Sequence, residues 1–139
     1  MALIAGAGNP LGSGGAGSTG TGLNYVLDRA YAFSGAVSCD NNETTLLSFT
    51  TGAQLINGTI QFFYAEPSND IFLYTVKLNN ELIVRFQVFG PNDTNGEHLL
   101  SLPIFLIVPP FSKVELLAKN NENTNARDQC GNFTGRVYG

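Results

Sequence analysis

The sequence predicts an all-β protein, an antiparallel eight-stranded jelly-roll sandwich that carries a flexible, Gly-rich N-terminal arm. Three observations support this prediction. After about residue 23 the chain consists of short apolar runs, separated by clusters of Asn, Gly, Pro and Asp. No window sustains apolar residues at helical spacing over three turns. Before residue 23, a short segment holds half of the protein's 16 glycines.

Residues 1–22 form the predicted arm, because their Gly, Ser and Thr content is typical of a flexible linker. Leu3, Ile4 and Leu11 are the sizeable apolar side chains of this segment. We expect these three residues to anchor the arm on a protein partner. Residues 1–5 are apolar but lack the basic residues that begin a secretory signal peptide, so we expect no export signal.

Residues 23–139 form the predicted body, a single domain of β-branched and aromatic strands. The predicted strands are, in order, residues 29–39, 44–51, 57–66, 71–78, 81–89, 102–108, 112–120 and 130–138. Residues 24–30 could form at most one helical turn. Without a longer helix to connect parallel neighbours, the sheets are expected to be antiparallel.

Turn-forming residues set the boundaries of these strands. Residues 40–42 form an Asx-rich turn, and Gly52 and the pair Asn57-Gly58 divide the second strand from the third. Asn79-Asn80 is predicted to be a two-residue hairpin turn, because Asn tolerates the left-handed conformation that such a turn requires. Pro109-Pro110 ends the sixth strand, since proline cannot donate a ladder hydrogen bond.

Alternation in two strands predicts which side chains share a face. The first strand is expected to place on one face Tyr31, Phe33, Gly35, Val37 and Cys39. The seventh strand is expected to place on one side Val114, Leu116 and Ala118.

The number of strands matches a single jelly roll, in which two Greek-key sheets pack face to face. In that topology the first and last strands are antiparallel neighbours, which brings Cys39 close to Cys130. We expect two buried free thiols. The alternative is a disulfide between them, which contributes about 4 kcal/mol in the chain-entropy model. An immunoglobulin-like sandwich is the rival fold, but it usually has a core Trp, and the chain has none.

The charge pattern and the length of the apolar runs argue against two classes of partner. Charged residues make up only 13% of the chain, its net charge is −4, and its seven Lys and Arg residues are isolated from one another. We therefore expect no nucleic-acid partner. The longest apolar run, residues 102–108, is far shorter than a membrane span, so we expect no membrane partner.

No sequence pattern predicts catalytic, cofactor-binding or metal-binding residues. His98 is the single histidine and is expected to be a solvated loop residue. Residues 12–17 match G-x-G-x-x-G, but the required strand before and helix after are missing. The Asx-rich segments 40–43 and 92–97 do not match a calcium loop. Four carboxylates lie in or beside predicted strands: Glu66, Asp70, Glu81 and Glu115. Their spacing in the sequence does not identify a catalytic pair of the glycosidase type. We expect no enzymatic activity.

The strand layout of residues 25–139 resembles the small single-jelly-roll proteins of virions, especially phage head decoration and minor capsid proteins. The resemblance is carried by residues 46–52 (LLSFTTG), 107–116 (IVPPFSKVEL) and 133–138 (FTGRVY). It implies a non-enzymatic homotrimer, located in the virion, that packs on the major capsid protein or another virion protein. The fold class by itself leaves the role open.

The sequence therefore predicts a virion structural protein, a decoration or minor capsid component that binds a larger shell through its arm and through lateral contacts. The alternative is a carbohydrate-binding β-sandwich, a lectin or viral adhesin-like module, because aromatic rings stack on the apolar faces of sugars. The candidate sugar-binding rings with a polar tip are Tyr25, Tyr31, Tyr64, Tyr74 and Tyr138.

Overall fold

The structure, a computed structural model, describes residues 22–64, 70–89, 103–121 and 126–139. Within these residues it contains ten strands and no helix. They are β1 (Asn24–Val26), β2 (Arg29–Phe33), β3 (Val37–Cys39), β4 (Thr44–Thr50), β5 (Leu55–Tyr64), β6 (Ile71–Leu78), β7 (Glu81–Phe89), β8 (Ile104–Val108), β9 (Lys113–Asn120) and β10 (Arg127–Tyr138). The proposed anchors of the arm, Leu3, Ile4 and Leu11, lie outside the described residues.

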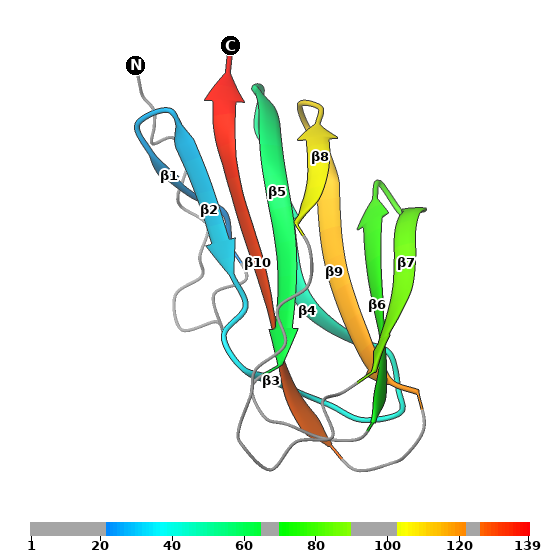
Figure 1. Cartoon of the computed structure of the whole chain (residues 1–139). Coiled ribbons are helices and arrows are strands. Elements are labelled where there is room, and N and C mark those ends of the chain that lie inside the picture. Colours follow the sequence, from blue (N-terminus) through cyan, green and yellow to red (C-terminus); the bar gives the residue numbers. More distant parts are fainter. Residues whose placement is uncertain (1–21, 65–69, 90–102, 122–125) are drawn as a thin grey trace.

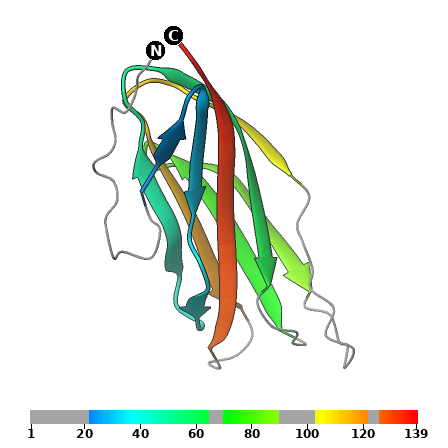
Figure 2. The same ribbon diagram turned by 90° about the vertical axis from the view of Figure 1, so that its left-hand side faces the viewer.

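The strands form two antiparallel sheets that face each other (Figures 1 and 2). The six-stranded sheet has the order β1-β2-β10-β5-β8, with β3 also paired to β10. The four-stranded sheet has the order β4-β9-β6-β7. With β2 and β3 taken together as the first strand, this is the strand order of a jelly roll, and the first and last strands are neighbours. The predicted fold class and topology are confirmed.

The predicted strand 29–39 is two strands, which accounts for part of the difference between eight and ten. β2 and β3 both pair with β10, but Gly35 between them has a φ of 69° and interrupts the extended chain. Ser34 holds the interruption against β10: its N–H donates to the Gly131 carbonyl over 2.9 Å, and its hydroxyl accepts from the Gly131 N–H over 2.8 Å.

The other additional strand is β1, within residues 24–30, for which the sequence allowed one helical turn but predicted no strand before residue 29. β1 pairs with β2 as a hairpin, and Leu27 takes a left-handed φ of 54° in the turn. Pairing with the edge of the sheet gives the β1 backbone hydrogen-bond partners that a single helical turn would leave unsatisfied.

The predicted face of the first strand was also wrong, because its side chains change sides at Gly35. Tyr31 and Phe33 point outward, whereas Cys39 is buried. The core side of β2 carries Ala30 and Ala32 instead, since Ala32 lies opposite the large buried side chain of Phe133. Only small side chains fit there beside that ring.

Asn57-Gly58 does not separate two strands, as the sequence suggested, but lies inside β5. Gly58 pairs with Gly135 of β10. A Cβ on Gly58 would overlap the ring of Phe133, so the glycine provides space for a core side chain and does not form a turn.

The predicted hairpin at Asn79-Asn80 is confirmed. Both residues have left-handed φ values, 52° and 70°, between β6 and β7. This is the type I′ pattern, which matches the twist of the flanking strands. The side-chain carbonyl of Asn79 accepts from the Lys113 N–H over 2.9 Å, so the turn is also attached to the start of β9.

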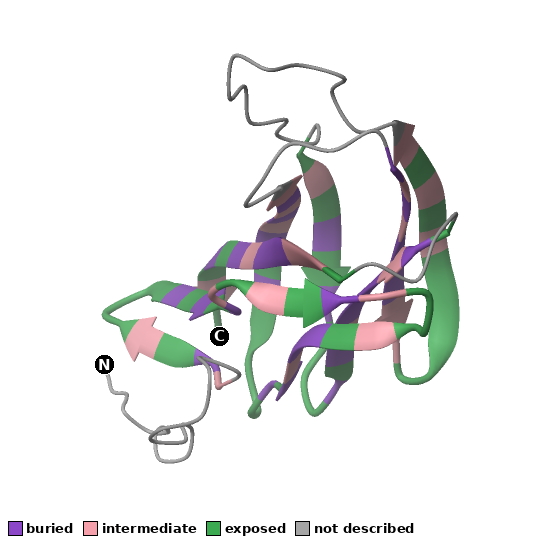
Figure 3. Cartoon of the chain, turned by 90° about the horizontal axis from the view of Figure 1, so that it is seen from below, coloured by how far each residue is buried: buried purple, intermediate pink, exposed green. Residues whose placement is uncertain are grey.

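The core lies between the sheets, and buried and exposed residues alternate along the strands (Figure 3). The rings of Phe62 (β5) and Tyr74 (β6) stack with their centroids 4.6 Å apart, and Phe49 (β4) lies 4.8 Å from Phe133 (β10). Full burial of one such ring contributes about 1.5–3 kcal/mol. The prediction for β9 is confirmed, because the side chains on its core side are all buried: Val114, Leu116 and Ala118.

Candidate binding face

The outer face of the six-stranded sheet, the surface that points away from the four-stranded sheet, carries most of the exposed aromatic side chains within strands. Directly paired residues on antiparallel strands project to the same side. The register therefore defines three rows across this face: Tyr31–Thr134–Thr59–Phe105, Phe33–Asn132–Gln61, and Arg29–Arg136–Asn57–Ile107.

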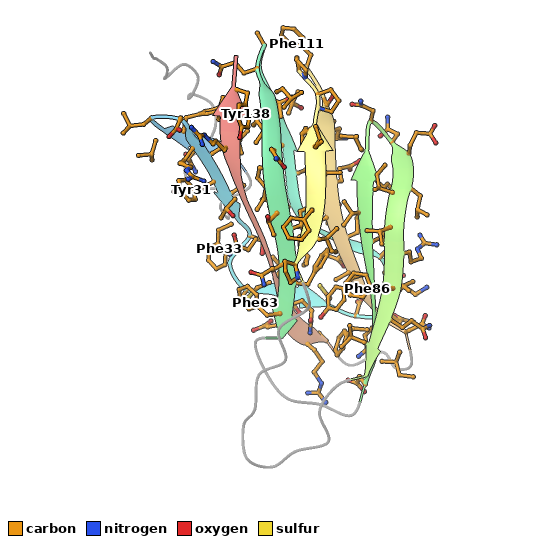
Figure 4. All side chains as sticks on the ribbon, turned by 45° about the horizontal axis from the view of Figure 1, so that its top comes forward. Tyr31, Phe33, Phe63, Phe86, Phe111 and Tyr138 are labelled. Carbon is orange, nitrogen blue, oxygen red and sulfur yellow. The ribbon has the colours of Figure 1, made fainter. Side chains whose placement is uncertain are left out.

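Aromatic side chains lie at both ends of the first row and at one end of the second. Phe33 is 51% exposed and Tyr31 43%. The ring of Phe63, on β5, lies 6.4 Å from that of Phe33 with 16° between the planes. Figure 4 shows Tyr31, Phe33 and Phe63 following one another down this side of the sheet. At the other end of the first row, across about 14 Å of sheet, Phe105 is 78% exposed.

The middle of the outer face is polar and uncharged. β10 contributes Asn132 and Thr134, and β5 contributes Gln61 and Thr59, all at least partly exposed. Amide and hydroxyl groups there can donate and accept hydrogen bonds. An aromatic end beside neutral hydrogen-bonding groups suits a flat partner, either another protein surface or a sugar.

The cationic row of the outer face is partly neutralised. Arg136 forms an exposed ion pair with Asp28, in the turn between β1 and β2, at 3.2 Å. The guanidinium of Arg136 also lies 5.4 Å from the ring centre of Tyr138. Exposed pairs of this kind contribute little to stability. Among the three rows no side chain is acidic.

Strand β8 forms one edge of the same sheet and is entirely apolar. It pairs with β5 over five residues without a register shift. Its inward side chains Leu106 and Val108 are buried, whereas Ile107 is 60% exposed beside Phe105. The described part of the chain therefore presents an unpaired backbone edge together with two large apolar side chains.

Cys39 and Cys130 are both buried free thiols in the structure, although they lie on neighbouring strands. Burial, with further contributions from the nearby Asp128, Asp40 and Cys130, raises the pKa of Cys39 to about 12. Burial and the charge of Asp128 also raise the pKa of Cys130. Both groups are protonated thiols at neutral pH, and a protonated thiol is a poor nucleophile.

A buried polar cluster joins the starts of β6 and β10 to the end of β9. The Asp70 carboxylate accepts hydrogen bonds from Asn120 Nδ2 at 2.9 Å and from Arg127 Nε at 3.2 Å. Nearby, the Tyr74 hydroxyl donates to the side-chain carbonyl of Gln129, whose Nε2 has no partner among the described residues. These contacts connect three strands at one end of the sandwich.

The other carboxylates singled out from the sequence do not form a pair with Asp70. Glu115 contacts Lys113 at 3.5 Å, and Glu81 is exposed at the start of β7. Glu66 and His98 lie outside the described residues. The register places Glu115 opposite Lys77 and Glu81 opposite Leu78, at the end of β6 that lies farthest from Asp70.

The part of the chain that the structure describes contains no metal-binding cluster and no helix that could span a membrane. No group of three or more His, Cys, Asp or Glu side chains is arranged to hold a metal ion. Asp40 instead accepts a hydrogen bond from the Asn42 N–H over 2.8 Å and stabilises its own turn. Residues 92–97 are not described. No described segment is a helix of the length and apolarity that would span a membrane.

The sequence named Tyr31, which lies on the outer face, and Tyr74, which is buried in the core, as candidate sugar-binding rings, but it did not identify the outer face as a site. It proposed the arm anchors Leu3, Ile4 and Leu11, which lie outside the described residues, and expected Phe side chains in the core or on sheet faces without distinguishing the two. The five apolar residues of β8 alternate between buried and exposed. A uniformly apolar run contains no signal that could tell its inner side from its outer side.

No family model and no curated protein sequence matches the chain. Solved structures resemble it at low identity. A family 35 carbohydrate-binding module from an environmental isolate has a TM-score of 0.43 and 18% identity, over 89% of this chain and 77% of that one. The structure of infectious bursal disease virus Gx strain has a TM-score of 0.44 and 15% identity, over 78% of this chain. The chain spans 31% of that viral protein.

A further carbohydrate-binding module, from Paenibacillus barcinonensis, has a TM-score of 0.37 and 10% identity, over 89% of this chain and 83% of that one. The identities of these three structures lie between 10% and 18%. The jelly-roll assignment rests on the strand order and register described above.

Proposed function

We propose that this protein is a virion structural protein, a decoration or minor capsid component that packs on a larger shell. The observation that carries the proposal is the exposure of large apolar side chains, with Phe105 and Ile107 foremost, on one face of a β-sandwich. A cluster of this kind on a protein surface marks an interaction site. The virion setting comes from the resemblance in the sequence.

The sparse charge of the chain supports a surface that other protein covers. Protein interfaces are depleted in charged residues at their centre and enriched in aromatic ones. The outer face shares this composition in part, since it carries the exposed aromatic residues Tyr31, Phe33 and Phe105 and the Thr and amide groups between them are uncharged. The partners proposed are identical copies, in a homotrimer, and the major capsid protein or another virion protein.

In this proposal the arm, residues 1–22, lies along a neighbouring subunit and is held by Leu3, Ile4 and Leu11. Ordering a flexible segment costs about 1–2 kcal/mol per residue, so only an extended interface offsets this cost. Glycine allows the chain to follow an irregular surface closely. The proposal includes no enzymatic activity, cofactor, nucleic acid or membrane.

The test is co-sedimentation with purified phage capsids that lack this protein, combined with the native mass from light scattering. We expect the full chain to bind particles and to form a discrete trimer or larger assembly. The chain without residues 1–22 should bind at least tenfold more weakly. Equal binding without the arm contradicts the role of the arm, and no binding by either form contradicts the function.

A second candidate function, carbohydrate binding, is favoured by one specific arrangement. The nearly parallel rings of Phe33 and Phe63 lie beside the amides of Asn132 and Gln61, which pair with each other across β10 and β5. Rings of this kind stack on the apolar faces of sugars, while amides bind hydroxyl groups. A glycan array with the full chain tests it.

The glycan test needs a matched pair of variants. Phe33→Ala removes a ring from the proposed sugar-binding face, and Phe111→Ala removes an exposed ring from the β8–β9 turn. A carbohydrate-binding function predicts loss of glycan binding in Phe33→Ala alone. Glycan binding that both variants retain excludes this face as the sugar site, and no binding by the unmodified chain leaves the structural function as the sole candidate.

A further inference from the structure

We propose that strand β8 pairs with β8 of a second copy of this chain, antiparallel and about a two-fold axis at Leu106. This inference rests on the proposed function in that both need association between copies. It goes further by naming the contact, its symmetry and its register. The occupant of the exposed edge is therefore a second copy of the same five-residue strand.

A comparison of the sheet edges singles out β8. Natural proteins protect edge strands by making them very short, by charges, by proline or by β-bulges, and the prolines near β8 lie outside its five residues. β1 has three residues. β4 and β7 each belong to a ladder with a register shift, and β7 also carries the charged side chains Glu81 and Arg85. β8 has no charged residue and no register shift.

Prolines limit the stretch of β8 that can pair and so determine the register. Pro103 precedes the strand, and Pro109 and Pro110 follow it. Because proline donates no hydrogen bond, pairing is confined to the five residues between them. An antiparallel pair that uses all five residues of both copies places Leu106 opposite its own copy, with Phe105 opposite Ile107 of the second copy.

This register is complementary to itself. The two symmetric pairs of Phe105 with Ile107 combine an aromatic and a β-branched side chain, a favourable cross-strand combination. Since β8 carries no charge, two copies meet without like-charge repulsion. A two-fold contact requires a patch that matches itself, and an antiparallel strand pair satisfies that requirement.

The contact has a structural consequence for the assembly. Pairing at β8 joins the six-stranded sheets of two copies into one continuous sheet. It places both outer faces, with Tyr31 and Phe33 at their far ends, on the same side of the joined sheet. A trimer that also made this contact would become a hexamer, so the expected effect of the contact is a twofold change in native mass.

The experiment compares two double variants of the full chain by light scattering. Phe105→Lys/Ile107→Lys places lysine opposite lysine in the proposed register, and Phe105→Lys/Ile107→Glu places lysine opposite glutamate. Both remove the same two apolar side chains, so the difference between them reports on charge pairing in that register alone. Phe111→Lys, at an exposed residue outside β8, is the control.

We expect the unmodified chain and Phe111→Lys to have twice the native mass of the double-lysine variant. The lysine–glutamate variant should recover the doubled mass with at least tenfold tighter self-association than the double-lysine variant, and high salt should reduce this difference. Far-UV circular dichroism confirms that each variant is folded.

The outcomes separate this inference from the proposed function. Equal masses for the unmodified chain and the double-lysine variant overturn the β8 contact. If the lysine–glutamate variant does not recover the doubled mass, the proposed register is wrong. In the alternative register, residue 105 lies opposite residue 105 of the second copy, which places lysine opposite lysine in this variant as well. Either of these results is compatible with particle binding through the arm. If instead the unmodified chain has the doubled mass but does not bind particles, only the virion function is contradicted.

Discussion

The ring of Phe133 occupies the space beside Gly58 that a Cβ atom would need. Phe133 pairs with Ile60 across β10 and β5, so its ring reaches Gly58 diagonally along the core side of the sheet. This contact explains a glycine in the middle of a long strand, where the residue otherwise weakens the strand.

Gly58→Ala should therefore destabilise the protein by overpacking. We expect the free energy of unfolding, measured in urea, to fall by about 1–3 kcal/mol, since the Phe133 ring has to shift. Gly52→Ala is the control, because no atom lies within 4 Å of the site of its new Cβ. An equal effect of both substitutions would contradict the packing explanation.

Two substitutions of Asn80 in the hairpin turn should change the stability in opposite directions. Asn80 is exposed and has a φ of 70°. Asn80→Gly should raise the free energy of unfolding by about 0.5 kcal/mol, because glycine adopts this conformation without strain. Asn80→Val should lower it by about 1–2 kcal/mol, because a β-branched side chain opposes a left-handed φ. Thermal unfolding of the pair measures both effects, and a stabilising valine would be incompatible with the turn described.

The ion pairs Asp70–Arg127 and Asp28–Arg136 both have a separation of 3.2 Å. The first is more buried than the second, so the two should contribute differently to stability. Asp70→Ala removes the buried carboxylate that binds Asn120 and Arg127, and we expect a loss of about 2–3 kcal/mol. Asp28→Ala removes the exposed partner of Arg136 and should cost less than about 1 kcal/mol. Chemical denaturation of both variants makes the comparison, and similar losses would show that burial does not determine the strength.

The thiol of Cys39 should make stability depend on alkaline pH. Its pKa rises from the ordinary value of 9.0 to about 12 in the folded protein, so folding favours the protonated form. This contribution is fully present below pH 9 and is lost as the pH rises toward 12. We expect the free energy of unfolding to fall less steeply in that range for Cys39→Ala than for the unmodified chain. Parallel pH profiles of Cys39→Ala and the unmodified chain would contradict the raised pKa of Cys39.

The same two cysteines can be counted by alkylation without reductant. We expect slow reaction with iodoacetamide at pH 8 in the native protein, because both thiols are buried and protonated. In urea two adducts should form, as measured by mass spectrometry. No adducts in urea would show that Cys39 and Cys130 form the disulfide that the sequence left as the alternative.

Local chemistry allowed the sequence to predict most of the strands and some of their boundaries. Asn79-Asn80 between two apolar runs favours a hairpin wherever it occurs, and Pro109-Pro110 ends a strand in any context. The alternation in β9 likewise identified its buried side from its own residues. The absence of a longer helix predicted antiparallel sheets, and the number of strands predicted the jelly roll.

The tertiary structure alone decided which side of β2 and β8 faces the core. Ala30 and Ala32 point inward because Phe133 already fills the space opposite, and no residue of β2 contains that information. The sequence wrongly predicted Gly58 to be a turn residue, because Phe133, whose ring needs the space beside Gly58, is distant from it in the sequence. The exposure of Phe105 depends on β8 being at the edge of the sheet, and packing between distant segments determines that position.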